Sequence, residues 1–183
     1  MKTVSYQQPR LGRPPAWRTL LAGGFGIGII AFTAAVELPI RLVWNASASV
    51  PIGLYAVRDH ARIQRDVTVL VEPPEPLASF LAERGYLPSG VPLLKRVEAL
   101  PGATVCRHGL VVSVDGEPRA LSRERDRFGR PLPVWSGCRT VAKGQLFLLN
   151  VEADDSLDGR YFGPIPASSV VGRVAPLFVR DER

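Results

Sequence analysis

An uncharged, mostly apolar run covers residues 19–36, and no comparable run follows it. Eighteen residues just suffice to cross a bilayer as a helix, with help from flanking residues. The segment before it is basic and holds no acid. Its positive charges are Lys2, Arg10, Arg13 and Arg18. This bias predicts a basic cytoplasmic tail over 1–18, a transmembrane anchor over 19–36 and an exported domain over 37–183, placed in the periplasm of a bacterial cell with the anchor in the inner membrane.

Two other interpretations of the apolar run remain open. A cleaved signal peptide would use Thr33, Ala34 and Ala35 as small residues near the cut, and it would export the domain just as an anchor does. The run is longer than a usual signal-peptide core, which favours the retained anchor. A buried core helix is less favoured, because a glycine-rich run is poorly helical in water.

Beyond the anchor, apolar positions come in short runs separated by turn residues. They predict strands over 53–57, 66–72, 91–100, 105–114, 145–151 and 169–179, and a helix over 77–86. Asp115-Gly116 is a strong hairpin-turn signal. Residues 117–137 are rich in Arg, Pro and Gly and predict an extended loop. The expected fold class is mainly β, an antiparallel β-sandwich or barrel-like domain behind one N-terminal transmembrane helix.

The net positive charge of the chain raises the question of whether it binds nucleic acid. The chain has 183 residues with 17 Pro, 17 Gly and a net charge of +6. A second basic cluster consists of Arg119, Arg123, Arg125, Arg127 and Arg130. Glu124 and Asp126 dilute this cluster, and no recognised nucleic-acid-binding motif accompanies it. We therefore expect a solvated loop and no nucleic-acid partner.

The two cysteines, Cys106 and Cys138, predict a disulfide, because the domain is expected to be exported. Such a bond would close a loop of about thirty residues and stabilise the fold by roughly 3 kcal/mol. A metal site using Cys106, His108 and Cys138 is the alternative. Its spacing is unlike that of common zinc sites and a fourth ligand is missing. We expect no metal and no cofactor.

Lys95 is the candidate catalytic base. The basic residues are overwhelmingly Arg, and the only lysines are Lys2, Lys95 and Lys143. Lys95 interrupts an apolar strand, and burial there would lower its pKa. A shift to about 8 would cost roughly 3 kcal/mol and give an amine that can take a proton from a serine. The alternative is a lysine that points outward from a half-exposed strand.

A Ser-His-Asp triad is not expected. Of the two histidines, His60 lies in a charged stretch and His108 lies beside a turn glycine. Both are interpreted as surface imidazoles, because neither setting suggests burial next to a serine.

Four short motifs resemble, in order, those of the type I signal peptidase family. They are S-V-P-I-G-L-Y at 49–55, L-K-R-V at 94–97 with Pro101-Gly102, D-S-L-D-G-R-Y-F-G-P at 155–164, and Gly172-Arg173. The first is most similar to the motif of the TraF-type peptidases of conjugative transfer systems. Only one residue separates its serine from its proline, where general signal peptidases commonly have two. The match covers about residues 45–177.

The resemblance implies a signal-peptidase fold and a Ser/Lys dyad. Ser49 would attack the scissile carbonyl, and Lys95 would act as general base and then as general acid. Ser47 would help the backbone N–H of Ser49 to bind the oxyanion. Ser156 matches the family serine that hydrogen-bonds and orients the lysine amine.

Asp158 and Arg160 match a structural pair that holds the loop of the third motif. A surface salt bridge between neighbouring residues would give the same pattern. Two positions depart from the family. Gly159 replaces a second serine, so any hydrogen bond of that hydroxyl is absent, and Ala103 replaces the acid commonly seen after Pro-Gly.

The implied substrate is a propilin or another exported protein held at the membrane and cut at a small-residue site. An acyl-enzyme would permit hydrolysis by water or cyclisation by a pilin amine. Expected partners are the lipid bilayer and mating-pair components of a type IV secretion system. Two alternatives stay open at this point, a general leader peptidase and a non-enzymatic scaffold of an envelope complex.

Overall fold

The computed structural model describes residues 16–35, 41–58 and 63–180. The chain divides into two units, Met1–Pro39 and Ile40–Arg183. The first contains helix α1, Ala16–Ala35, which begins three residues before the predicted start. Residues 16–33 of this helix have a mean hydropathy of 1.3 and none is buried. The helix is long and apolar enough to cross a membrane, which suggests membrane anchoring; Val36 and the tail before residue 16 lie outside the described residues.

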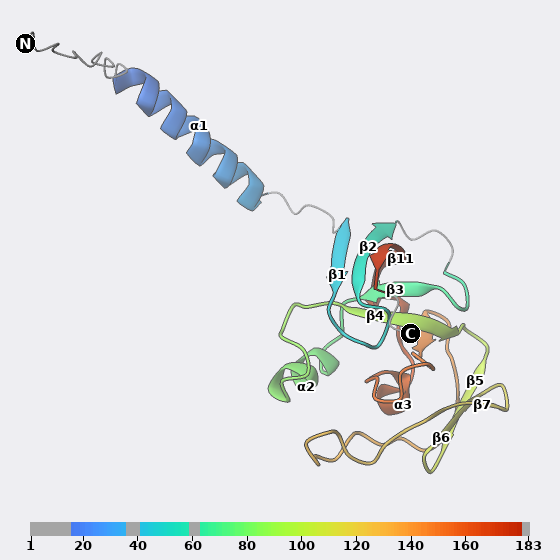
Figure 1. The fold of residues 1–183 in the computed structure, drawn as a ribbon. Helices are drawn as coiled ribbons and strands as arrows, with labels where there is room; N and C mark the ends of the chain where they lie inside the picture. The colour runs from blue at the N-terminus through green and yellow to red at the C-terminus, as the bar shows by residue number, and fades with distance from the viewer. Residues whose placement is uncertain (1–15, 36–40, 59–62, 181–183) are drawn as a thin grey trace, which may run out of the picture. The chain divides into compact units, whose positions relative to one another are not determined.

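The second unit is built on a seven-stranded antiparallel sheet, seen in the upper part of the domain in Figure 1. In spatial order its strands are β1 (Leu42–Asn45), β2 (Gly53–Arg58), β11 (Val170–Val179), β3 (Thr68–Val71), β4 (Leu93–Ala99), β9 (Gln145–Leu148) and β10 (Ile165–Pro166). The loop between β1 and β2 carries the predicted nucleophile. The long strand β11 pairs with both β2 and β3, and its residues Pro176–Val179 lie beside Gly53–Tyr55, the end of the first motif.

A separate four-stranded sheet follows from β4 (Figure 1). Its order is β7 (Glu117–Leu121), β6 (Val111–Val114), β5 (Thr104–His108) and β8 (Gly137–Thr140). The prediction of one strand over 105–114 is wrong. Gly109 adopts a φ of +61°, a conformation that side-chain-bearing residues seldom take, and there the chain reverses between β5 and β6.

The prediction of an extended loop over 117–137 is also wrong at both ends. It contains β7 and the first residue of β8. Strand β7 was not predicted because it lies at the edge of its sheet and its sequence, Glu-Pro-Arg-Ala-Leu, lacks an apolar run. The predicted Asp115-Gly116 turn is confirmed: it joins β6 to β7 with φ angles of +51° and +86°.

The core lies on both faces of β3 and β4. Leu70 and Leu94 pack with Tyr55 on one face, and Val69 and Val97 belong to a second cluster on the other. Side chains alternate along a strand, so almost every position of β4 is enclosed. A third cluster, around Phe147 and Leu149, fills the space next to the small sheet.

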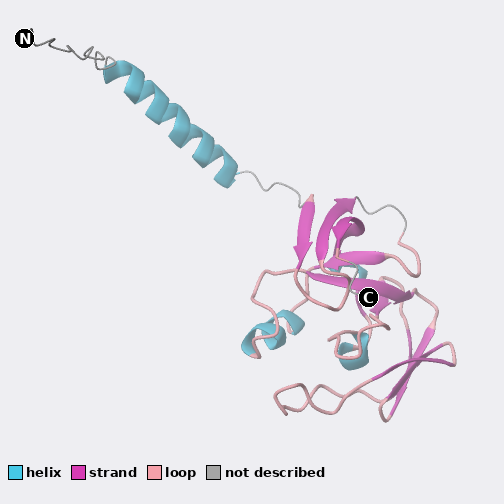
Figure 2. Ribbon diagram, viewed as in Figure 1, coloured by secondary structure: helices cyan, strands magenta, loops and turns pink. Residues whose placement is uncertain are grey.

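Two short helices and one 3₁₀ turn (Ala167–Ser169) complete the domain (Figure 2). Helix α2, Leu77–Glu83, is the predicted helix and ends earlier than expected. Helix α3, Gly159–Phe162, lies within the third sequence motif and had no predicted counterpart. With these small exceptions the domain is mainly β and antiparallel, as the sequence predicted.

Candidate active site

Lys95 points into the protein. It lies on β4 opposite Val69 of β3 and is only 4% exposed. Its Nζ donates a hydrogen bond of 2.8 Å to Ser156 Oγ, which is itself buried. The alternative of an outward lysine is therefore wrong. Burial lowers the pKa of Lys95 from 10.5 to about 8, with Asp158 and Asp155 acting in the opposite direction and Arg160 adding to the decrease.

The Asp158–Arg160 pair is fully buried, so it is not a surface salt bridge. Asp158 Oδ1 accepts from Arg160 N and Nε, each at 3.1 Å. Its Oδ2 accepts from Arg160 Nη2 at 3.2 Å and from Asn150 N at 3.0 Å. Arg160 Nη2 also donates to the carbonyls of Asn150 and Ala153, at 2.6 and 2.8 Å. These bonds give the segment that carries Ser156 one fixed conformation.

Asn150 holds the main chain on both sides of Lys95. Its Oδ1 accepts from Arg96 N at 2.9 Å, and its Nδ2 donates to Leu94 O at 3.4 Å. The pairing of β4 with β9 ends at Leu148, the last residue of β9. Beyond that point the Asn150 side chain supplies the hydrogen bonds to the main chain of β4. Asn150 therefore replaces two ladder hydrogen bonds beside the candidate base. Sequence reasoning missed this residue, which gives no local signal.

The loop that carries the predicted nucleophile, Ser49, is held by Asn45, the last residue of β1. Asn45 is 7% exposed. Its Nδ2 donates to the carbonyls of Ser47, Val50 and Pro51 at 2.8, 2.9 and 3.1 Å. Its Oδ1 accepts from Ser47 N at 3.1 Å and from Ser47 Oγ at 2.9 Å. An asparagine two residues before a polar loop residue is typical of an Asx-turn, and that signal was overlooked.

These bonds fix the direction of the contact between the two serines, Ser47 Oγ and Ser49 Oγ, which lie 3.1 Å apart. The three carbonyls around Nδ2 of Asn45 can only accept, so the amide orientation is settled by its partners. A hydroxyl has one proton, and that of Ser47 points to Asn45 Oδ1. Ser49 must therefore donate to Ser47. For Ser47 to act as an oxyanion donor, its bond to Asn45 has to break first.

Ser49 opens into a cleft of about 200 Å³. The lining residues are Ser49, Val50, Pro51, Tyr55, Thr68, Arg96, Asn150, Val151, Glu152, Pro176 and Val179. Arg96 reaches this cleft, while Lys95, one residue earlier, points to Ser156 from the other face of β4. The hydrogen bonds of the described residues include none between Ser49 and Lys95.

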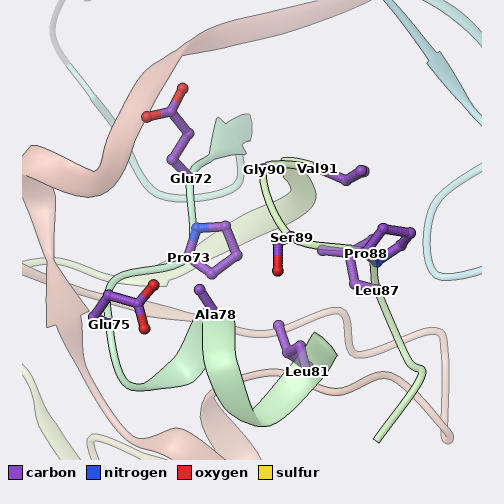
Figure 3. A pocket seen from close by; sticks show the side chains of 10 residues that line it. All are labelled: Glu72, Pro73, Glu75, Ala78, Leu81, Leu87, Pro88, Ser89, Gly90 and Val91. Atoms are coloured by element: carbon purple, nitrogen blue, oxygen red, sulfur yellow. The ribbon is translucent and has the colours of Figure 1, made fainter. Parts of the chain in front are cut away.

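A larger hollow of about 270 Å³ lies elsewhere, between α2 and the loop 87–91 (Figure 3). Glu72, Glu75 and Ser89 contribute its polar side chains, and both glutamates are exposed. Neither Ser49 nor Lys95 lines it. The predicted nucleophile, Ser49, therefore opens into the smaller of the two hollows, and Lys95 lines neither of them.

Cys106 and Cys138 form a disulfide across β5 and β8, where they stand directly opposite each other. His108 Nε2 lies 3.8 Å from Cys138 Sγ. These three are the one group among the described residues close enough to share a metal ion. Sulfurs bound to each other are not thiolate ligands, so the metal alternative fails in this oxidised form. His60 lies outside the described residues.

Comparison with known proteins settles the family. The model of the signal peptidase family, peptidase S26, matches residues 16–179. The chain belongs to this family. The resemblance drawn from four motifs is thereby confirmed, and the protein is a peptidase of the serine type.

Curated relatives are similar to this chain over most of its length. It is 39% identical over 149 residues to a conjugal transfer protein TraF of Agrobacterium fabrum, covering 75% of this chain and 82% of the relative. It is 32% identical over 143 residues to a plasmid transfer protein TraF of Escherichia coli, covering 73% and 80%. A signal peptidase I from Enterococcus faecalis aligns with 63% of this chain and 98% of its own, at 21% identity and a TM-score of 0.38.

Gly159, where the resemblance led us to expect a second serine, has no room for a side chain. A Cβ there would lie 2.5 Å from Phe147 Cε2 and 2.7 Å from the carbonyl oxygen of Leu148. The backbone oxygen cannot move aside as a side chain could. Close packing of α3 against β9 therefore explains this departure.

Proposed function

We propose that this protein is a membrane-anchored serine endopeptidase with a Ser49/Lys95 dyad, which processes a propilin for conjugative DNA transfer. The anchor would lie in the bacterial inner membrane, with the N-terminus in the cytoplasm and the catalytic domain in the periplasm. Family membership supports the peptidase activity, and the names of the relatives, conjugal and plasmid transfer proteins, support the role in conjugation. The observation that carries the assignment of the base is the burial of Lys95 against a neutral hydroxyl.

The environment of Lys95 suits proton transfer near neutral pH. With a pKa of about 8, roughly a tenth of the amine is neutral at pH 7. Ser156 accepts an N–H of Lys95 and so restricts where the remaining lone pair can point. A base with a pKa close to the working pH is efficient both in removing the serine proton and in returning it to the leaving amine.

Ser49 has to change partners before it reacts. In the free enzyme its proton is donated to Ser47, and Lys95 Nζ points to Ser156 from the other face of β4, so the step requires the β1–β2 loop to move until Ser49 Oγ–H reaches Lys95 Nζ. Catalytic hydrogen bonds often form only in the substrate complex. Ser49 Oγ then attacks the scissile carbonyl, the acyl-enzyme forms, and protonated Lys95 gives its proton to the departing amine. Water would release a linear pilin, and a pilin amine would release a cyclic one.

Mass spectrometry of a candidate propilin, co-expressed with the full-length protein, tests the dyad. Wild type should convert the propilin, while Ser49→Ala and Lys95→Ala should leave it at its precursor mass. Lys95→Arg is the sharper variant, since Arg keeps the charge but cannot act as a base. Lys143→Arg, at an exposed lysine, is the matched control and should process normally. Normal processing by Lys95→Arg would overturn the assignment of the base.

A general leader peptidase is the second candidate, and membership of the signal peptidase family supports it. The same cells separate the two functions when they also express a secretory precursor with an ordinary signal peptide. Processing of that precursor, with the propilin left intact, would replace the conjugative role. The non-enzymatic scaffold has no observation in its favour, because a buried lysine with a lowered pKa costs stability and a scaffold does not need one.

A further inference from the structure

Arg107 of β5 is a buried cation that the proposed reaction does not use. It is 1% exposed. Its guanidinium donates to three carbonyl oxygens, those of Gly109 at 3.2 Å, Pro133 at 3.2 Å and Arg160 at 2.7 Å. None of its contacts among the described residues is a carboxylate. Burying an arginine in this way is expensive, and an apolar side chain of similar size would fill the space at lower cost. The hydrogen bonds therefore point to a role beyond packing.

The shortest of these bonds ends on α3, the helix next to the candidate base. Carbonyls at the C-terminal end of a helix commonly lack partners within it, and arginine side chains can supply donors; in α3, Gly159 O already accepts from Gly163 N at 3.0 Å. Arg107 Nη1 takes Arg160 O, and Trp135 Nε1 donates to the neighbouring Gly159 O at 3.1 Å. Arg107 also lies over the ring of Tyr161, with Cζ 5.8 Å from the ring centre. Three contacts thus fasten α3 from the side of the small sheet.

Helix α3 in turn fixes what surrounds Lys95. Its first turn contains Arg160, whose side chain occupies both oxygens of Asp158. Ser156, two residues before Asp158, accepts the hydrogen bond of the Lys95 amine. The charged groups that act on Lys95 are Asp158, Arg160 and Asp155, all from this one segment. A shift of α3 would move the hydroxyl and the charges together.

We propose that Arg107 is a positioning residue, which holds α3 so that Ser156 and the Asp158–Arg160 pair stay packed against Lys95. The small sheet then has a function in the active site, although no hydrogen bond or ion pair of the described residues joins its strands to Ser49 or Lys95. This inference rests on the proposed function only in treating Lys95 as the base. Its structural content, that Arg107 sets the surroundings of Lys95, can be measured without any substrate.

The measurement is the titration of Lys95 by NMR in the full-length protein in detergent micelles. Lysine labelled with ¹³C at Cε gives signals only from Lys2, Lys95 and Lys143, and Lys95→Arg removes and so assigns the relevant one. In wild type the Lys95 signal should titrate near its pKa of about 8. In Arg107→Met, water reaches the amine and the midpoint should rise by about one unit. Trp135→Phe loses one donor to α3 and should shift the midpoint in the same direction by less.

Arg119→Met is the control for a general loosening of the domain. Arg119 lies on the small sheet and contacts Glu98 of β4 at 2.7 Å, so it joins the two sheets without touching α3. It should leave the Lys95 midpoint unchanged. Arg107→Lys, which keeps the charge and a donor, should fall between wild type and Arg107→Met.

Two results would overturn the inference. One is an unchanged Lys95 midpoint in a folded Arg107→Met protein, and the other is an equal rise in Arg119→Met. If Arg107→Met does not fold, Trp135→Phe and Arg107→Lys decide in its place, and a midpoint near 8 in both refutes the proposal. Failure of the proposed function looks different: Lys95→Arg would still process propilin, while the titration of Lys95 would still depend on Arg107.

Discussion

The replacement of Lys95 by methionine should make the protein more stable and inactive at once. The pKa of Lys95 falls from 10.5 to about 8 because the side chain is buried. At about 1.36 kcal/mol for each unit of pKa, this difference corresponds to a folding cost of about 3 kcal/mol. Methionine fills a similar volume without a charge. Against this gain stands the hydrogen bond to Ser156, whose loss costs about 1 kcal/mol. The net expectation at pH 7 is a gain of about 2 kcal/mol.

The gain must depend on pH in one direction. Between pH 8 and pH 10.5 the unfolded chain carries a proton on Lys95 that the folded chain has lost. Stability of the wild type therefore rises with pH across this window. Below pH 8 the full cost of about 3 kcal/mol is present, and above pH 10.5 it has vanished. Lys95→Met should thus exceed the wild type in stability at pH 7, and it should lie about 1 kcal/mol below it at pH 11.

Urea unfolding of the full-length protein in detergent, followed by the fluorescence of the buried Trp135, gives the required free energies. Lys143→Met serves as the control, since Lys143 is exposed and its replacement should change little. The reasoning is refuted if Lys95→Met is less stable than the wild type at pH 7. It is also refuted if the difference between the two is the same at pH 7 and pH 11, because a desolvated amine must show the linkage.

Three further predictions address the frame around the site. Gly159→Ser, which restores the residue expected from the family, should lower the free energy of unfolding by about 1–3 kcal/mol through overpacking; an unchanged melting temperature would contradict the close packing. Replacing both Cys106 and Cys138 by serine should lower the free energy of unfolding by about 3–4 kcal/mol, because the disulfide closes a loop of 32 residues. Calorimetry measures this difference, and a much smaller decrease would contradict the expected contribution of the disulfide. Asn45→Ala should slow propilin cleavage through kcat with KM nearly unchanged, because it frees the nucleophile loop; a change in KM alone would assign Asn45 to substrate binding instead.

The sequence predicted the parts of the site that carry a local signal. Lys95 was recognisable because a lysine in an apolar strand is unusual, and more so in a chain that otherwise uses arginine. Ser49 was recognisable from its motif. Strand β4 was predicted within two residues at each end, since its apolar pattern is dense and both faces are covered.

Other features depended on partners far along the chain. The hydrogen bond between Ser156 and Lys95, 61 residues apart, was predicted from the family resemblance and is confirmed, but nothing predicted that Arg107 donates to carbonyls 26 and 53 residues away. Nothing beside Arg107 in the sequence distinguishes it from the exposed arginines, because its acceptors are main-chain carbonyls that any residue provides. The prediction of one strand in place of β5 and β6 was wrong because the local signal is ambiguous. A glycine inside an apolar run is compatible with a continuous strand, and only the backbone angle at Gly109 decides.

The arrangement of charges explains how a lysine can lose its proton next to an aspartate. A carboxylate in contact with Lys95 would stabilise the ammonium and raise its pKa. Asp158 is close enough to act in that direction, yet both of its oxygens are taken by Arg160 and by Asn150 N. The pair is neutral as a unit, and the direct partner of the lysine is the uncharged hydroxyl of Ser156. Arg160 therefore does more than hold a loop: by occupying Asp158 it removes the counter-ion that would keep Lys95 charged, and it leaves burial as the dominant influence on the pKa of Lys95.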